Sequence, residues 1–347
     1  MNGMETSSAS PVLHPRLLGW WRDDPSDPGR ASLDDPDVRQ LVTAIAPDAR
    51  VTDLGGVMSL NARLEPAGLV LRIHRPFVSQ RRLLAVQEVR RRLAGLGLVV
   101  PVPVRWRAAT VLRCGHRWAE LEAYLPHARP APTPEAFLAL FAAIGSLHRA
   151  LATIQVAVPQ PRVAIYAPPG TLRRWLPATE AAVSGDPEAE EVARLLHALV
   201  GRLRAQWVRE TALPVQLVHG DGHLRNVCRT PTGQPVYLDF GFLAHRPRVH
   251  ELAYALAWMI VALDGHQALE SFAWERVPRL ITAYEATAGT TLTAAERRAL
   301  APYTAAAPLY HAAIAGFTHD PARQLRAERP FLRLSEWLLT HPDVLFG

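Results

Sequence analysis

The sequence contains no lysine, and all 38 of its basic residues are arginine. A Walker A loop places a lysine on the phosphates of its nucleotide, so this absence excludes P-loop chemistry. Cysteine is also scarce. The two cysteines, Cys114 and Cys228, are too few for the disulfide framework of a small secreted domain, and such scarcity suits a reducing compartment. We therefore expect a cytoplasmic protein.

Targeting segments and long apolar runs are missing as well. The stretch Met1–Pro11 has no basic cluster followed by an apolar run, which a secretory signal would require. The longest purely apolar run, Leu252–Leu263, is too short to cross a bilayer and predicts a buried helix. The formal charge of +6 is spread along the chain instead of being clustered as in a nucleic-acid binder. We expect neither a membrane nor a nucleic acid as partner.

What the sequence does contain is enough apolar material for one large domain or two moderate ones, with 49% hydrophobic residues in 347. Residues 51–74 form short alternating segments broken at Gly55–Gly56 and Pro66–Gly68, which predicts antiparallel strands. Ser79 is a candidate N-cap for a helix that reaches about residue 94. Further extended segments follow up to residue 125. The first part is therefore predicted to be mostly β.

The second part has helical periodicity. After the proline-rich stretch 129–134, Thr133 is a candidate N-cap and Pro134 a first helical residue, and further helices are predicted at 188–207, 250–263, 274–288 and from 293 onward. Strands followed by helices are typical of the α+β class. We predict an N-terminal extension over residues 1–40, a strand-rich lobe over 41–126 and a helical lobe over 127–347.

The most informative stretch lies between residues 215 and 241. An apolar strand leads into His219-Gly220-Asp221, Asn226 follows five positions later, and a second short strand ends in Asp239-Phe240-Gly241. Phosphoryl transfer needs one carboxylate to orient a hydroxyl and accept its proton, while an amide oxygen and a second carboxylate hold the metal on the phosphates. The pattern predicts a phosphotransferase.

These residues resemble the His-Gly-Asp-x-x-x-x-Asn and Asp-Phe-Gly motifs of the aminoglycoside phosphotransferase and choline kinase family. The resemblance covers roughly residues 51–263 and implies a bilobal, protein-kinase-like fold that uses ATP and Mg²⁺ to phosphorylate a small-molecule hydroxyl. It also implies that Asp221 is the catalytic base, that His219 braces the catalytic loop, and that Asn226 and Asp239 bind Mg²⁺.

The resemblance extends to the nucleotide-binding lobe. Arg72, on the segment 69–75, takes the place of the usual lysine that contacts the nucleotide phosphates, and Glu88 on the next helix would be its ion-pair partner. Glu88 also lies at helical spacing from Arg91 and Arg92, so an ordinary surface pair is the alternative. Ser59 would donate to a phosphate oxygen from a covering loop that lacks a full Gly-x-Gly-x-x-Gly.

Segment 120–126, with Glu122 and Tyr124, resembles the hinge whose backbone groups recognise adenine. Two other functions stay open. A protein kinase is disfavoured because no Ala-Pro-Glu segment follows Asp239, and a catalytically silent nucleotide- or metabolite-binding module is possible because Arg72 replaces lysine.

The acceptor, a metabolite or an antibiotic, is not identified by any motif. Arginines are frequent after His245, whereas a polycationic aminoglycoside would need a pocket rich in carboxylates. In the predicted helix 250–263, Tyr254 stands where a zinc-protease motif needs its second histidine, and Trp258 is expected in the core.

Overall fold

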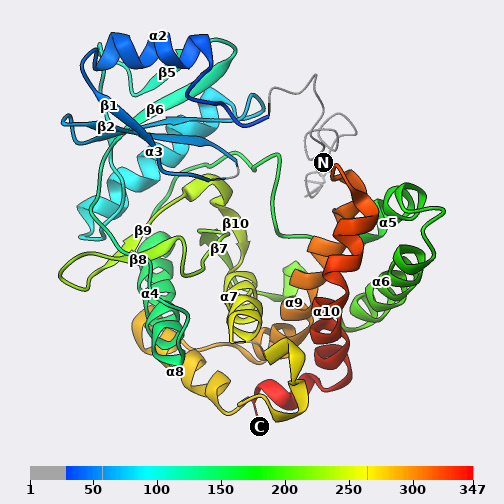
Figure 1. Ribbon diagram of the computed structural model, residues 1–347. Helices are drawn as coiled ribbons and strands as arrows, with labels where there is room; N and C mark the ends of the chain where they lie inside the picture. Colours follow the sequence, from blue (N-terminus) through cyan, green and yellow to red (C-terminus); the bar gives the residue numbers. More distant parts are fainter. Residues whose placement is uncertain (1–28, 57, 264, 347) are drawn as a thin grey trace, which may run out of the picture.

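The computed structural model describes residues 29–56, 58–263 and 265–346. It has two lobes, a strand-rich N-lobe and a larger helical C-lobe (Figure 1). The fold is therefore α+β, as the order of predicted elements indicated. The remaining residues, including 1–28 of the predicted extension, lie outside the described part of the chain.

The N-lobe is built on one antiparallel sheet with the strand order β1-β2-β3-β6-β4, and β5 pairs with β6. Two helices, α2 and α3, belong to the same lobe (Figure 1). The bounds of the strands are β1 Arg50–Asp53, β2 Leu60–Glu65, β3 Leu69–Ile73, β4 Pro103–Val104, β5 Val111–Cys114 and β6 Arg117–Ala123.

Alternating side chains explain how the sheet packs. In β2, Leu60, Ala62 and Leu64 are fully buried and the residues between them are not, so one face of the strand points into the lobe. Helix α2, Pro36–Ile45, adds Val38 and Leu41 to this small core. The predicted boundary at residue 40 is therefore wrong, because it cuts through a helix whose apolar side chains belong to the N-lobe core.

Helix α3, Gln80–Gly95, begins where predicted, since the Ser79 side chain accepts a hydrogen bond from the backbone N–H of Arg82. Its buried residues Val86, Val89 and Leu93 belong to the main core cluster of the C-lobe instead of the N-lobe cluster. Helix α3 therefore connects the two lobes.

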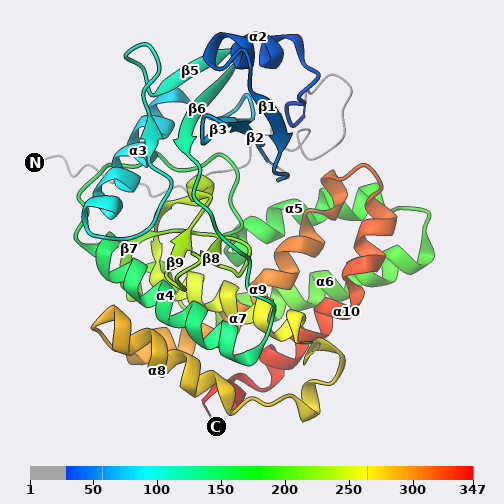
Figure 2. The same cartoon turned by 60° about the vertical axis from the view of Figure 1, so that its left-hand side comes forward.

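The C-lobe is a helical assembly around α7, Arg248–Ala262 (Figures 1 and 2). Helix α4 lies along α8, and α9 contacts both α7 and α10. The bounds of the other helices are α4 Pro134–Ala152, α5 Pro169–Ala182, α6 Pro187–Gln206, α8 Arg276–Ala288, α9 Ala294–Ala313 and α10 Pro321–Thr340.

The predicted caps at Thr133 and Thr293 are both present, and Thr293 forms a full capping box with Glu296. Helix α5 was not predicted, and α10 lies in the region from residue 293 onward, which was predicted to be helical without bounds for separate helices. Each contains an internal proline, Pro177 or Pro330, which interrupts the pattern that marks a helix. Among the described helices, α4 is long and apolar enough to cross a membrane, but much of it is buried against the rest of the lobe.

Four short strands surround the loops that carry Asp221 and Asp239. Strand β7, Val215–Val218, pairs with β10, Ala244–Pro247, and β8, Val227–Arg229, pairs with β9, Pro235–Tyr237. The loop that carries Asp221 lies between β7 and β8, and the segment that carries Asp239 follows β9. These two pairs therefore bring the two carboxylates to the same side of the C-lobe, below the N-lobe.

Candidate active site

The loop after β7 turns sharply at Gly220, which has φ +82°. A Cβ atom there would lie 2.6 Å from the backbone oxygen of Phe242, in the segment that follows Asp239. Only glycine accepts both the left-handed backbone and this close approach. Gly220 therefore lets the loop with Asp221 lie directly against the Asp-Phe-Gly segment.

Glu251 of α7 holds this loop from below. Its carboxylate accepts hydrogen bonds from the backbone N–H of His219 (3.0 Å) and of Gly220 (2.9 Å), and its Oε2 lies 2.7 Å from His148 Nε2. Burial would raise the pKa of Glu251, but the contact with His148 and the nearby histidines lower it to about 2. The carboxylate is thus held charged inside the lobe.

The sequence reasoning missed the role of Glu251 and considered it only as part of a failed zinc motif. One signal was available, because an acidic residue directly before the apolar run 252–263 of a buried helix needs a buried partner. The partners are backbone N–H groups, which a sequence pattern does not reveal.

Asp221 lies next to Asn226 on the loop. Asn226 Nδ2 donates to Asp221 Oδ2 at 2.8 Å and to the backbone oxygen of Asp221 at 3.1 Å. His223 Nε2 lies 3.3 Å from Asp221 Oδ1. Because the amide nitrogen faces Asp221, the amide oxygen of Asn226 is directed away from it and is available to a metal.

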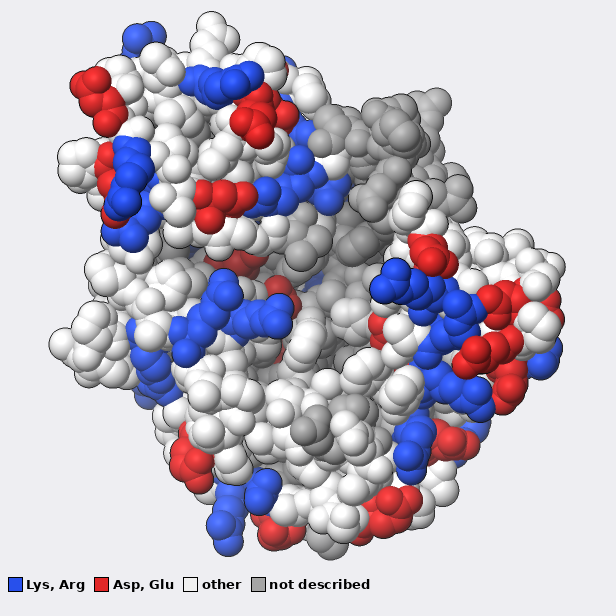
Figure 3. Space-filling model, in the orientation of Figure 1, with Lys and Arg blue, Asp and Glu red and all other residues white. Residues whose placement is uncertain are grey.

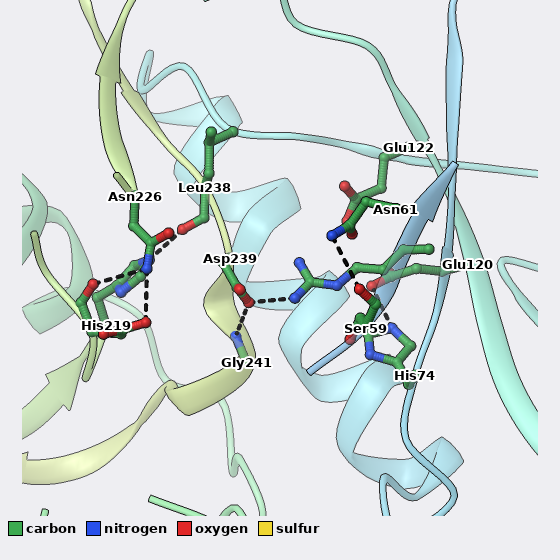
Figure 4. Close-up of polar contacts among 12 residues, drawn as sticks. Ser59, Asn61, His74, Glu120, Glu122, His219, Asn226, Leu238, Asp239 and Gly241 are labelled. Carbon is green, nitrogen blue, oxygen red and sulfur yellow. Dashed lines mark hydrogen bonds and ion pairs between the residues drawn. The ribbon is translucent and has the colours of Figure 1, made fainter. Parts of the chain in front are cut away.

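The chain before Asp239 is tied to the same loop (Figure 4). The backbone N–H of Leu238 donates to the backbone oxygen of Asn226 at 2.8 Å, and His219 Nε2 lies 2.7 Å from the backbone oxygen of Leu238. Asp239 adopts φ +55°, and its side chain accepts from the backbone N–H of Gly241 at 3.2 Å. The structure thus brings His219, Asp221, Asn226 and Asp239 together.

Arg72 of β3 reaches across from the N-lobe and forms an ion pair with Asp239. The side chain of Arg72 is 10% exposed, whereas that of Asp239 is 39% exposed. Burial would lower the pKa of Arg72, but the charges of Asp239, Glu122 and Glu120 raise it overall. Partial burial would raise the pKa of Asp239, and Arg72 outweighs that effect and lowers it.

Arg72 belongs to a buried cluster of charges that we call the clamp. Its other members are Arg90 of α3 and Glu120 and Glu122 of β6. Arg90 forms ion pairs with both glutamates, and Glu120 also lies 3.1 Å from His74 Nε2. Burial would lower the pKa of Arg90, but the two glutamates raise it. Glu122, predicted at the hinge, therefore has its side chain inside the N-lobe.

The predicted pair between Glu88 and Arg72 is wrong. Glu88 pairs with Arg91 and with Arg92 on the surface of α3, and its side chain is 38% exposed. These were the alternative partners that helical spacing offered. The charges are arranged differently from the prediction. Helix α3 contributes a cation, Arg90, and the buried carboxylates come from β6.

The other two residues predicted to bind the nucleotide, Ser59 and Tyr124, lie next to strands of the sheet: Ser59 directly before β2 and Tyr124 directly after β6. Ser59 is buried, 6% exposed, at the end of the loop that follows β1, and it shares a cavity with Arg72. Asn61 of β2 donates from Nδ2 to the backbone oxygen of Gly55, in that loop, at 2.8 Å. Tyr124 follows β6, where its backbone N–H donates to Gly68 O at 2.8 Å and Arg63 stacks on its ring.

Arg82 is a further residue that the motifs did not reveal. It is buried, and its guanidinium donates to the backbone oxygens of Gly241 (2.8 Å), Leu243 (2.9 Å) and Pro159. Burial and the nearby Arg246 lower the pKa of Arg82 to about 10. Arg82 therefore ties the start of α3 to the Asp-Phe-Gly segment of the other lobe.

A cavity of about 340 Å³ opens between the lobes, lined by Ser59, Arg72, Arg75, Asp239 and Gly241 among others. Figure 3 shows the hollow between the lobes, with acidic atoms inside it. Among the described residues, no group of three His, Cys, Asp or Glu side chains is arranged to hold a metal. A Mg²⁺ ion at Asn226 and Asp239 would have two protein oxygen ligands, which fits an ion that takes further ligands from phosphates and water.

Comparison with known proteins agrees with this geometry. Residues 55–289, about two thirds of the chain, match the phosphotransferase enzyme family. No curated protein sequence matches the chain. Many solved structures share its fold at low identity, among them the following three. A microcompartment-associated aminopropanol kinase is 17% identical with a TM-score of 0.70, and the match covers 90% of this chain and 99% of that one.

The second is an amicoumacin kinase in complex with AMP-PNP, Ca²⁺ and its antibiotic, at 16% identity and a TM-score of 0.60, covering 86% of this chain and 93% of that one. The third is a spectinomycin phosphotransferase in complex with ADP and spectinomycin, at 14% identity and a TM-score of 0.57, covering 88% and 98%. The protein therefore belongs to the phosphotransferase enzyme family and has the fold of the small-molecule kinases in it.

Proposed function

We propose that the protein transfers the γ-phosphoryl group of ATP to a hydroxyl of a small molecule, with Asp221 as the general base and Mg²⁺ held by Asn226 and Asp239. One observation carries the proposal. Hydrogen bonds join Asp221 to Asn226 and Asn226 to the chain that presents Asp239, which in turn pairs with Arg72. Base, metal ligands and phosphate cation thus form one connected unit at the cleft.

Asp221 orients the acceptor hydroxyl and accepts its proton as the new bond to phosphorus forms and the bond to the leaving ADP breaks. Asn226 keeps Asp221 in position through its amide nitrogen. His219 and Glu251 fix the backbone of the loop, so Asp221 needs little rearrangement when the acceptor binds.

Arg72 offers a planar guanidinium that can bond two phosphate oxygens at once. Its ion pair with Asp239 must be shared or released when nucleotide and metal bind, because the metal would bind the Asp239 carboxylate and the phosphates would bind the Arg72 guanidinium. When bound, Mg²⁺ would neutralise charge on the phosphates. The two nucleotide complexes among the similar structures support ATP as the donor.

A small-molecule acceptor is supported by the similar structures, which are an aminopropanol kinase, an amicoumacin kinase and a spectinomycin phosphotransferase. We also propose that the enzyme acts in the cytoplasm, where ATP is available, and that neither nucleic acid nor a membrane is its partner. The scarcity of cysteine supports this location. The dispersed charge supports the proposal that nucleic acid is not a partner.

The test is phosphate transfer from ATP to an alcohol, followed as ADP formation and as phosphorylated product, with and without Mg²⁺. We expect both to require the metal. Calorimetry of ATP binding then isolates the metal site: Asp239→Ala should lose the gain in affinity that Mg²⁺ gives, because one metal ligand is missing.

Asp48→Asn, an exposed carboxylate in the loop after α2, is the control and should keep that gain. If ATP binding to Asp239→Ala depended on Mg²⁺ as strongly as in the wild type, the metal would be held elsewhere and the assignment would be wrong.

A further inference from the structure

A second cavity, of about 170 Å³, lies between α7, α9 and α10 in the C-lobe. We call it the aromatic pocket. Its wall contains three aromatic side chains, Tyr254, Trp258 and Phe331, together with His311 and Glu328; the remaining lining residues are Ala257, Val261, Ala307 and Pro308. Trp258 was expected in the core, but it is only partly buried and lines this pocket.

The aromatic pocket adjoins the proposed base. His223, whose Nε2 is 3.3 Å from Asp221, has its ring 5.5 Å from the ring of Trp258. Tyr254 interacts with Asp221 directly; burial raises the pKa of its phenol, and the charge of Asp221 raises it further. An acceptor seated in the pocket would therefore present its hydroxyl towards Asp221.

The charge of the wall limits what can bind. Glu328 is the one carboxylate among the lining residues, and neither lysine nor arginine lines the pocket. Burial lowers the pKa of His311, so its imidazole is uncharged near neutral pH. Figure 3 likewise shows the middle of the C-lobe face, below the hollow, as largely uncharged. The wall can neutralise one ammonium group but not several.

Glu328 is placed to pair with such a group. Burial raises the pKa of its carboxyl, and Gln324 Nε2 donates to its Oε1 at 2.7 Å. The Oε2 atom is then left for a ligand. A partly desolvated carboxylate gains more from a cationic partner than an exposed one, and the aromatic faces beside it also favour an ammonium group.

Size gives the second limit. A cavity of roughly 150 Å³ with apolar walls is enough to hold one benzene molecule. The aromatic pocket, at about 170 Å³, therefore accommodates one ring or an aliphatic group of that size. Larger parts of an acceptor would have to lie outside it, in the cleft.

We propose that the acceptor is an alcohol that carries a single amino group, paired with Glu328, and an apolar group of about one ring, seated between Tyr254, Trp258 and Phe331. This inference rests on the proposed function, which it makes specific. It excludes polycationic aminoglycosides, as the arginine-rich C-lobe suggested, and it makes Glu328 the residue that selects for the amine.

Three probes that differ by one group test it. In 2-amino-1-phenylethanol the hydroxyl, amine and ring are all present, 1-phenylethanol lacks the amine, and 1-amino-2-propanol has a methyl group in place of the ring. Binding is measured by calorimetry with the nucleotide-free enzyme, and phosphorylation as ADP formation. Removing the amine or the ring should weaken binding at least tenfold each, and kanamycin should bind more weakly than the first probe.

Glu328→Gln should weaken binding of 2-amino-1-phenylethanol at least tenfold and change that of 1-phenylethanol less than twofold. The matched control is Glu336→Gln, an exposed glutamate on the same helix, which should leave both unchanged. If the amine contributed nothing in the wild type, if Glu328→Gln weakened both probes equally, or if kanamycin bound best, the inference would be overturned. If the variant fails to fold, the comparison of the three probes with the wild-type enzyme still tests the inference.

The two claims fail separately. Amine-dependent binding that requires Glu328, without ADP formation from any of the probes, would support the pocket and reject phosphotransfer. ADP formation from alcohols regardless of amine and ring would support phosphotransfer and reject the specificity assigned to the aromatic pocket.

Discussion

The loop that carries Asp221 and the clamp both contain buried charges close to Asp239, yet they are held together differently. The carboxylate of Glu251 on α7 holds the loop by accepting hydrogen bonds from its backbone N–H groups. In the clamp, Arg72 and Arg90 are paired with carboxylates of β6 and of the Asp-Phe-Gly segment. The loop is fixed through its backbone, and the clamp through its side chains.

This difference between backbone and side-chain contacts predicts which positions tolerate substitution. Backbone contacts at Gly220 require a fixed loop shape, so we expect a side chain at this position to disturb the loop. Side-chain pairs need only opposite charges in reach, so a chain without lysine can place its cations on β3 and α3 and its acids on β6. The predictions below test this contrast.

The largest effect is expected at Glu251. Glu251→Ala removes the acceptor of two buried backbone N–H groups and the partner of His148, and breaking such a buried network should cost about 3 kcal/mol or more in the free energy of unfolding. Turnover should also fall at least 100-fold at a temperature where the variant is folded. Denaturant unfolding and steady-state kinetics measure the two effects.

The pKa of Glu251 also predicts a pH dependence. Its folded value, about 2, lies below the ordinary 4.5, so ionisation of Glu251 contributes stability that is present above pH 4.5 and lost as pH falls towards 2. The isosteric Glu251→Gln should reduce the slope of unfolding free energy against pH in that window. An unchanged slope would mean that the carboxylate is not charged in the fold.

A smaller effect is expected at Arg72. Arg72→Met should raise the KM for ATP and lower kcat by about tenfold each, because an interaction with the phosphates and the partner of Asp239 are both lost. Arg72→Lys should be intermediate, since an ammonium keeps the charge but not the fork. Arg113→Met, on the exposed side of β5, is the control. A fully active Arg72→Met would place the phosphate cation elsewhere.

The smallest effect is expected at Glu88. Because its partners Arg91 and Arg92 lie on the surface, Glu88→Ala should change the unfolding free energy by less than about 1 kcal/mol and leave kinetics within twofold of the wild type. A loss of activity that disappeared in the Arg72→Met background would show coupling between the two positions and restore the pair that the structure does not contain.

Much of the fold could be predicted because its signals are local. The caps at Ser79 and Thr133 and the alternation in β2 depend on neighbouring residues alone. The missed helix α5 contains a proline that hides its periodicity, and α2 was divided because its polar start resembles a loop.

The residues of the candidate site likewise fall into those that local sequence predicts and those that only the fold brings together. His219, Asp221, Asn226 and Asp239 lie within one short stretch, so their spacing could be interpreted without a structure. The clamp joins Arg72, Arg90 and Glu120 from separate elements, and sequence alone gave no reason to prefer Glu120 over Glu88 as the buried acid. Glu328 lies far from the motif in the sequence, and only the packing of α10 with α7 and α9 brings it into the same pocket as Tyr254 and Trp258.

The central claim is that Asp221 acts on the acceptor hydroxyl and not on the nucleotide. The most direct measurement compares kcat with the Kd for ATP in Asp221→Asn, an isosteric change that removes the proton acceptor. We predict that kcat falls by at least 100-fold while the Kd for ATP in the presence of Mg²⁺ stays within about threefold of the wild type. A variant that keeps near-normal kcat would contradict the assignment of Asp221 as the base.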